Sequence, residues 1–192
     1  MDDNDFDRFC TRDLRGEHMA QSGSVGGGRD FSAGETDSYS WKLLDQAAQE
    51  ALMQLAVFRG GGSREAVQII TGTSLQTLMR LVNKSLLARD PETGRYFCHT
   101  LLQQYAENQL EQAGLTRKTH DRHSQYYLNF MYERHTILHG QNPLQALDQF
   151  EADMGNIRTA WSHAMDMKHY DLIQRAMTGL LPRVENNSSA KP

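Results

Sequence analysis

Apolar side chains recur every three or four positions along most of the chain from Trp41 onward, which is the spacing of one face of an α-helix. The first run extends from Trp41 to Phe58 and is stopped by "RGGGS". Ser63 and Ser74 each precede another short run and are suited to N-cap it, because a serine hydroxyl accepts a hydrogen bond from the first helical turn. The pattern predicts three helices, the last two joined by "TGTS" as a helix-turn-helix.

The third helix, from Ser74 to Leu86, carries apolar residues that we expect to face the core: Leu75, Leu78, Met79, Val82 and Leu86. Next, "LLARDPETGRYFCH" places two short extended runs around Pro and Gly, which are turn formers, and this predicts a β-hairpin. The stretch "YFCHTLLQQYAENQL" then passes from a strand directly into a helix that starts near Thr100. Three helices with such a wing predict a winged helix over residues 39–113.

The second half is predicted to be helical throughout, over residues 116–181, with a tail at 182–192. One helix spans 116–138, a second opens at Pro143, and a third covers about 170–181. The second has an almost continuous apolar stripe that we assign to the core: Leu147, Phe150, Met154, Ile157, Trp161 and Met165. Short connections favour antiparallel neighbours, so the fold class is mainly α, with a winged helix followed by an antiparallel helical bundle.

Charge divides the chain into two parts. Residues 1–38 hold nine acidic and four basic side chains, a net charge of −5, and few large apolar groups. We expect this segment to be a flexible leader that is dispensable for folding. Because the whole chain carries −4, the remainder is close to +1 and lacks the basic character of a dedicated nucleic-acid binder.

The two cysteines, Cys10 and Cys98, form neither a disulfide framework nor a metal knuckle. A reducing, cytoplasmic setting is the simplest fit to that usage. The sequence shows no signal-peptide pattern and no run with the roughly 18 apolar residues that a membrane span needs. We therefore expect no membrane association.

Four segments in order resemble the bacterial STAND signalling ATPases, in which a P-loop ATPase domain precedes a winged helix and tetratricopeptide-like (TPR-like) helical repeats. The segments are "SYSWKLLDQAAQEALMQLAVFRGG", "LMRLVNKSLLARD", "RYFCHTLLQQYAENQL" and "FEADMGNIRTAWSHAM". The last resembles the start of the repeat region, so the resemblance implies that residues 116–181 begin a TPR-like α-solenoid. It also implies a non-enzymatic switch-and-sensor module, with an ATPase domain in cis or in trans and a protein partner on the helices.

His99 is the site residue that the resemblance suggests. Related switch proteins have Met-His-Asp where this chain has Cys98, His99 and Thr100, so only the histidine is retained. The resemblance implies that His99 senses the β-phosphate of ADP held by the ATPase domain. The alternative is that His99 only satisfies a local backbone group. No G-x-x-x-x-G-K-[ST] occurs, so ADP or ATP belongs to the missing ATPase domain and we expect no cofactor in this chain.

A free-standing DNA-binding regulator is the second functional hypothesis, because winged helices commonly read DNA. Its contacts would come from the face of the third helix turned away from the core: Gln76, Thr77, Arg80, Asn83 and Lys84. Residues 39–115 hold seven basic and seven acidic side chains. A neutral module forgoes most of the phosphate attraction on which DNA binders depend, so DNA is the less favoured partner.

Two pairs of histidines share helix faces, His120 with His123 and His135 with His139, a spacing that also occurs in metal sites. No cysteine or carboxylate completes either set, so we interpret them as solvated histidines on a polar face and expect no metal site. No nucleophile is paired with a base in the sequence, and Cys98 lies on a strand expected to be buried, where a thiol is inert. Enzyme activity is therefore not predicted.

Overall fold

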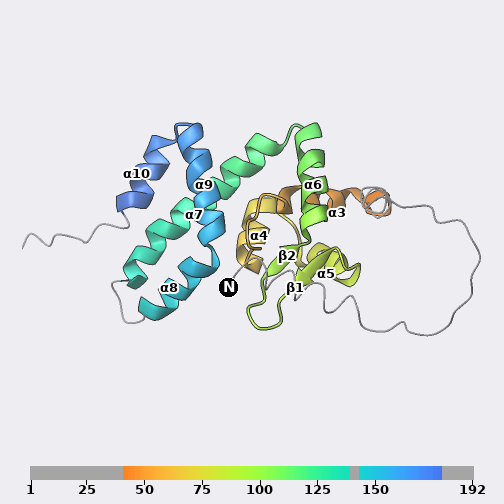
Figure 1. The fold of residues 1–192 in the computed structure, drawn as a ribbon, viewed down its shortest axis with the longest axis horizontal. Coiled ribbons are helices and arrows are strands. Elements are labelled where there is room, and N and C mark those ends of the chain that lie inside the picture. The colour runs from red at the N-terminus through yellow and green to blue at the C-terminus, as the bar shows by residue number, and fades with distance from the viewer. Residues whose placement is uncertain (1–40, 139–142, 179–192) are drawn as a thin grey trace, which may run out of the picture.

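The computed structural model describes residues 41–138 and 143–178, and the predicted leader 1–38 and tail 182–192 lie outside those ranges. The described chain is mainly helical, with one small antiparallel sheet. Figure 1 shows α3 to α6 and the two strands in one half of the molecule and α8 to α10 in the other, with α7 reaching from one half to the other. None of the described helices is long and apolar enough to cross a membrane.

The first half contains three short helices before the strands. They are α3 (Gln46–Leu55), α4 (Arg64–Thr71) and α5 (Leu75–Asn83). The predicted caps are confirmed, since the hydroxyls of Ser63 and Ser74 accept hydrogen bonds from the first turns of α4 and α5. The single helix predicted from Trp41 is interrupted. Trp41 and Lys42 are helical, but Asp45 is extended and its carboxylate accepts from the Ala48 N–H, so that α3 begins at Gln46.

The predicted hairpin is confirmed by β1 (Leu87–Arg89) and β2 (Tyr96–Cys98), which pair antiparallel with Ala88 opposite Phe97. Between them, the Asp90 carboxylate accepts hydrogen bonds from two backbone N–H groups of the turn. A further bridge joins Tyr96 to Gly62 in the loop after α3. The chain then enters α6 (Thr100–Gln112) directly from β2, so this loop, β2 and α6 are connected by backbone hydrogen bonds and by the chain itself.

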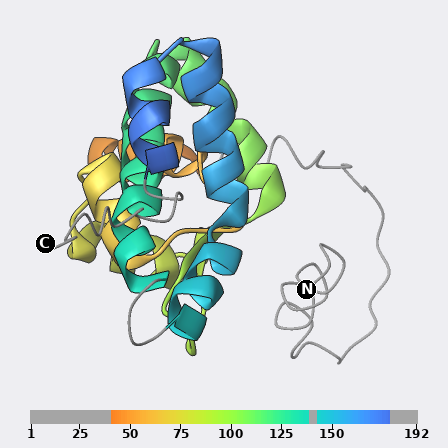
Figure 2. The same cartoon turned by 90° about the vertical axis from the view of Figure 1, so that its left-hand side faces the viewer.

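The second half contains α7 (Thr116–Leu138), α8 (Pro143–Ala152), α9 (Met154–Asp166) and α10 (Tyr170–Thr178). α9 runs back along α7, as the two views in Figures 1 and 2 show. The single helix predicted from Pro143 to Met165 is wrong, because the chain breaks at Asp153 between α8 and α9. Asp153 leaves helical geometry, with φ −108° and ψ 9°, and its carboxylate bonds to residues far away in sequence instead of capping α9.

One hydrophobic core extends through both halves, and its fully buried members include Leu52, Ile70, Leu78 and Leu128. Two predicted core stripes need correction. On α5 the inward residues are Thr77, Leu78 and Leu81, whereas Leu75 and Met79 are exposed. In the second half, Leu147, Met154 and Met165 are exposed, whereas Ile157 is buried as predicted and Phe150 and Trp161 are half-buried and pack against the core. α9 also packs through Ala160 and Ala164, which were not in the predicted stripe. The small side chains of Ala160 and Ala164 let α9 approach α7 closely.

Candidate functional site: a buried polar junction

Three segments far apart in the sequence meet where the two halves of the molecule join. The first is the loop after α3, which contributes Arg59 and Gly61. The second is Arg95, the residue before β2. The third is the start of α9, which contributes Asp153 and Asn156. We call these five residues the junction. Each lies in one of the segments 38–61, 95–110 and 150–165, although nothing in the sequence indicates that these segments touch.

Asn156 is the centre of the junction and has no exposed surface. Its side-chain oxygen accepts a hydrogen bond from the Arg59 backbone N–H at 2.7 Å, and its amide nitrogen donates to the Gly61 carbonyl at 2.8 Å. The same nitrogen donates to the Asp153 carboxylate at 3.1 Å. One amide side chain therefore satisfies both a donor and an acceptor of the loop, which fixes that loop against α9.

Arg95 and Asp153 form an ion pair of 2.7 Å, and their side chains are only 11% and 9% exposed. Arg95 also donates to the Gly61 carbonyl at 3.1 Å. The Tyr127 hydroxyl of α7 donates to the same Asp153 oxygen at 3.2 Å, and burial followed by the Asp153 charge raises the pKa of that hydroxyl well above its ordinary value. Because the Arg95 and Asp153 charges are paired and hydrogen-bonded, the free-energy cost of burying them is offset.

His123 completes the buried surroundings and is also fully inaccessible. Its Nε2 lies 3.3 Å from the Asn156 side-chain oxygen, which can only accept, so the ring donates from Nε2. Its Nδ1 has no hydrogen-bond partner, and burial lowers the pKa of His123 to about 4. The ring packs edge-on against Phe58 at a centroid distance of 5.4 Å. His123 is thus a neutral core residue, and its prediction as a solvated histidine is wrong.

Two glycines allow the backbones to approach each other at the junction. A Cβ on Gly155 would lie 2.9 Å from the Arg59 carbonyl oxygen, which is closer than real contacts permit. A Cβ on Gly61 would lie 2.5 Å from the Phe97 ring, and Gly61 also has φ +72°, in the left-handed region. The close contact of α9 with the loop after α3, and of that loop with β2, therefore requires glycine at both places.

His99 lies outside the junction, at the exposed N-cap of α6. Its Nδ1 accepts a long hydrogen bond, 3.4 Å, from the Leu101 N–H. The junction is linked to His99 along the chain, because Arg95 immediately precedes β2 and β2 ends one residue before His99. It is also linked to α6, the helix that His99 caps, because Arg59 pairs with Glu107 at 2.7 Å. The His99 ring lies between β2 and α6, as the sequence predicts. This position fits both a phosphate sensor and a residue that only caps the helix.

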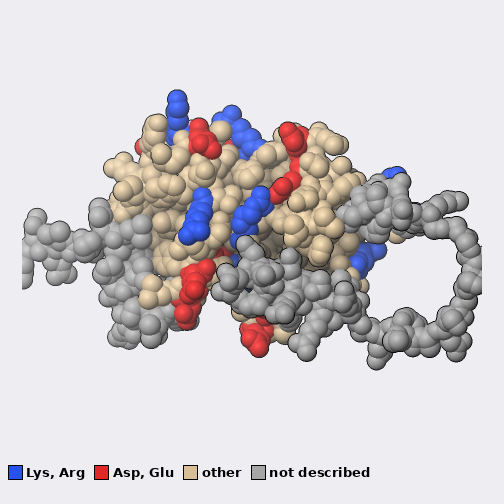
Figure 3. Space-filling model, in the orientation of Figure 1, with Lys and Arg blue, Asp and Glu red and all other residues tan. Residues whose placement is uncertain are grey.

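The five residues proposed for DNA contact do not form one free polar face. Thr77 is buried, which corrects its predicted outward position, and its hydroxyl lies 3.0 Å from that of Ser74. The Arg80 guanidinium donates to the Asp45 carboxylate at 2.6 Å. Gln76, Asn83 and Lys84 are exposed, beside the exposed apolar side chains of α5. The face of the molecule shown in Figure 3 carries basic and acidic side chains interspersed on a largely uncharged surface.

The remaining histidine predictions concern α7. His120 is half-buried between the two halves of the molecule, whereas the side chains of His135 and His139 lie outside the described residues. Among residues 41–138 and 143–178, no group of three or more His, Cys, Asp or Glu side chains is arranged to hold a metal ion. Cys98 is partly buried and forms no disulfide.

For two of the junction residues, Asp153 and Asn156, the sequence held a signal, because they are polar positions beside the apolar stripe of α9. Asp153 and Asn156 are three residues apart and precede the apolar Ile157 and Ala160 on α9. Comparison of the chain with models of protein families, with curated proteins and with solved structures gives no significant match. The functional assignment therefore depends on the geometry described above and on the resemblance of the four segments.

Proposed function

We propose that this chain is a non-enzymatic regulatory module, built like the winged-helix switch and the first sensor helices of a STAND signalling ATPase. The order α3, α4, α5, β1, β2 supports a winged helix, with α6 following the wing. The helices α7 to α10 then correspond to the start of a TPR-like array. The observation that carries the proposal is the junction, because it ties the start of α9 to both the loop after α3 and the residue before β2.

In such a module, the junction transmits a movement of the helical half to the winged-helix half. A partner that binds the helical half and displaces α9 acts directly on Asn156 and Asp153. Those residues hold Gly61 and Arg95, which flank the bridge between Gly62 and Tyr96. A shift of α9 is therefore transmitted to β2 and to the N-terminus of α6, since buried polar networks have few alternative arrangements that keep every group satisfied.

In the proposal, His99 is the residue whose position changes when α9 shifts. Because Nδ1 accepts from the Leu101 N–H, a neutral ring carries its proton on Nε2, which is free to donate to an anion. The N-terminal N–H groups of α6 add a favourable partial charge. In the assembled system the anion is the β-phosphate of ADP on the ATPase domain, which that contact holds in its resting state. If His99 serves only as the α6 N-cap, ADP binding is independent of it.

ADP retention tests the proposal. The STAND-class ATPase domain encoded nearest to this chain in its genome is loaded with fluorescent ADP and mixed with the chain. We expect ADP release to slow on mixing, and both His99→Ala and Asn156→Ala to restore fast release. Asn83→Ala, on exposed α5, is the matched control and should behave as the wild type. The proposal is wrong if the ATPase domain neither binds the chain nor changes its rate of ADP release.

The DNA-binding alternative has one feature in its favour, the proposed helix-turn-helix of α4 and α5. Against it, Thr77 is buried, Arg80 is paired with Asp45, and Leu75 and Met79 expose apolar surface on the same helix. Fluorescence anisotropy with duplex DNA distinguishes the two functions. We expect retention only at very low salt, whereas tight binding at physiological salt would favour the DNA-binding regulator.

A further inference from the structure

A row of histidines lines the contact between α7 and α9, beside the junction. The His163 Nε2 lies 2.7 Å from the Asp121 carboxylate, and the His163 side chain is only 14% exposed. The rings of His120 and His163 are stacked, with a centroid distance of 5.3 Å and an interplanar angle of 30°. The ring of His169, just before α10, lies edge-on to His163 at 6.3 Å. We call His120, Asp121, His163 and His169 the histidine seam.

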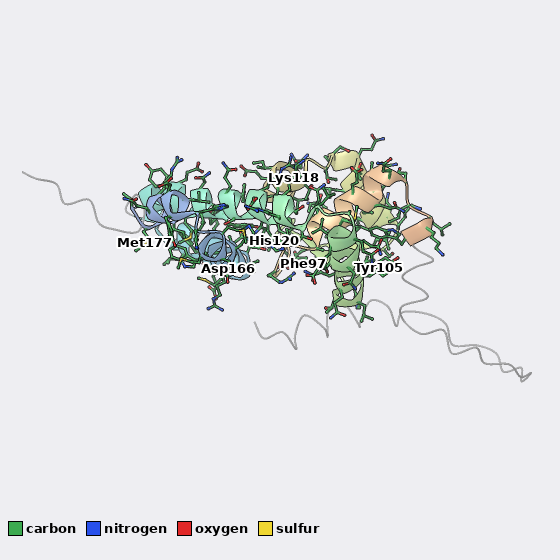
Figure 4. All side chains as sticks on the ribbon, turned by 90° about the horizontal axis from the view of Figure 1, so that it is seen from above. Phe97, Tyr105, Lys118, His120, Asp166 and Met177 are labelled. Atoms are coloured by element: carbon green, nitrogen blue, oxygen red, sulfur yellow. The ribbon has the colours of Figure 1, made fainter. Side chains whose placement is uncertain are left out.

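Charged groups from the loop after α3, from α6 and from α7 face this seam. Arg59, in the loop after α3, and Glu107, on α6, approach His120 and are bonded to each other at 2.7 Å. On α7, Arg117 lies 3.9 Å from Asp121. Figure 4 shows His120 midway along the molecule, between Phe97 of β2 and Asp166 of α9. The seam therefore holds α9 to α7 at the place where the two halves of the molecule meet.

We propose that the histidine seam is an acid-sensitive latch, which holds α9 and α10 on α7 while at most one of the two stacked rings is protonated and releases them when both are. The proposal concerns this chain alone and does not rest on the regulatory function above.

The two protons differ in their surroundings. The Asp121 carboxylate lies within hydrogen-bonding distance of His163 and compensates one positive charge on the stacked pair. A second positive charge on the pair, at His120, faces His163 and Arg59, with only Glu107 and Asp121 in opposition. Burial, then His163 and Arg59, lowers the pKa of His120 below its ordinary value. Two stacked cations cannot both be neutralised by one carboxylate, so acidification separates the helices that carry them.

Trp161 reports on this opening, because it is half-buried on α9, whereas the other of the two tryptophans, Trp41, is buried in the first half. A Trp41→Phe variant therefore has its emission from α9 alone, and a Trp161→Phe variant from the first half alone. As pH falls from 7.5 to 4.5, we expect the Trp161 emission maximum to shift to the red with one midpoint while that of Trp41 stays constant. A simultaneous shift of both with one midpoint would mean global unfolding and would overturn the latch.

Two variants in the Trp41→Phe background should move the midpoint in opposite directions. His120→Gln removes the second proton site and lowers the midpoint by about half a pH unit or more, whereas Asp121→Asn removes the compensating charge and raises it by a similar amount. Exposed His99→Gln is the control and leaves the midpoint unchanged. General destabilisation would raise the midpoint in both seam variants. That result, or the absence of any Trp161 shift, contradicts the proposal.

Discussion

Asn156 joins both halves of the molecule with a single side chain, and its replacement tests how much that link stabilises the fold. Asn156→Ala leaves the Arg59 N–H and the His123 Nε2–H without their buried partner, whereas the Gly61 carbonyl keeps its hydrogen bond from Arg95. Each unsatisfied buried group costs about 1–3 kcal/mol, so we expect the free energy of unfolding to fall by about 3 kcal/mol. Urea unfolding measures this loss. Asn83→Ala on exposed α5 should change stability by less than about 0.5 kcal/mol, and an equal loss in both variants would contradict the role of Asn156.

His99 should behave differently, because its ring is exposed and its one hydrogen bond is long. We expect His99→Ala to lower the stability of this chain by less than about 1 kcal/mol, the range for a weak helix cap. Thermal unfolding of the wild type, His99→Ala and His99→Asn provides the measurement, since asparagine restores a cap without the imidazole. A large loss in His99→Ala that asparagine recovers would identify His99 as a structural cap and argue against the sensor role.

At the scale of elements, the ion pair of Arg95 and Asp153 ties the start of β2 to the start of α9. A double-mutant cycle with Arg95→Met and Asp153→Asn measures how strongly the two side chains are coupled. We expect each single variant to lose about 3 kcal/mol, because it leaves a buried charge unpaired, and the double variant to lose clearly less than the sum. The exposed pair Arg80 and Asp45 is the matched control, and its cycle should show no measurable coupling. Equal coupling in both cycles would contradict the importance of burial.

Elements governed by local chemistry could be predicted from the sequence, and those governed by distant partners could not. Ser63 and Ser74 cap α4 and α5 because a cap needs only the next three residues. The break before α9 was missed because Asp153 pairs with Arg95, 58 positions away in the sequence. The inward face of α5 was misassigned because Thr77 satisfies its hydroxyl with Ser74 and so replaces Met79 in the core.

The candidate site shows the same division. The position of His99 before α6 follows from the strand-to-helix pattern and was predicted. The environment of His123 was not, because the side chains that bury it come from the loop after α3 and from α9, and its own helix face is polar. Hydrophobic periodicity describes a single helix, whereas burial of a polar residue depends on which group another element brings opposite to it.

At the scale of the whole molecule, His123 makes stability depend on pH. Its pKa in the folded state, about 4, is below the ordinary value of 6.5, so the unfolded chain binds more protons between these values. We expect its contribution to be fully present above about pH 6.5 and to be lost as the pH falls toward 4, a loss of about 3 kcal/mol. Urea unfolding at a series of pH values measures this slope. His123→Gln keeps an N–H donor and should flatten it, and an unchanged slope would rule out His123 as its source.

In the proposed regulatory module, the junction allows α9 to fix the loop after α3 and β2, and so to control the position of His99. Amide hydrogen exchange in Asn156→Ala tests it most directly, because the Gly62 and Tyr96 N–H groups bond to each other's carbonyls across this contact. We predict that exchange at these two amides accelerates about 30-fold, equivalent to about 2 kcal/mol, while amides within α5 and α10 change little. Unchanged exchange at Gly62 and Tyr96, or the same acceleration throughout the molecule, would contradict the claim.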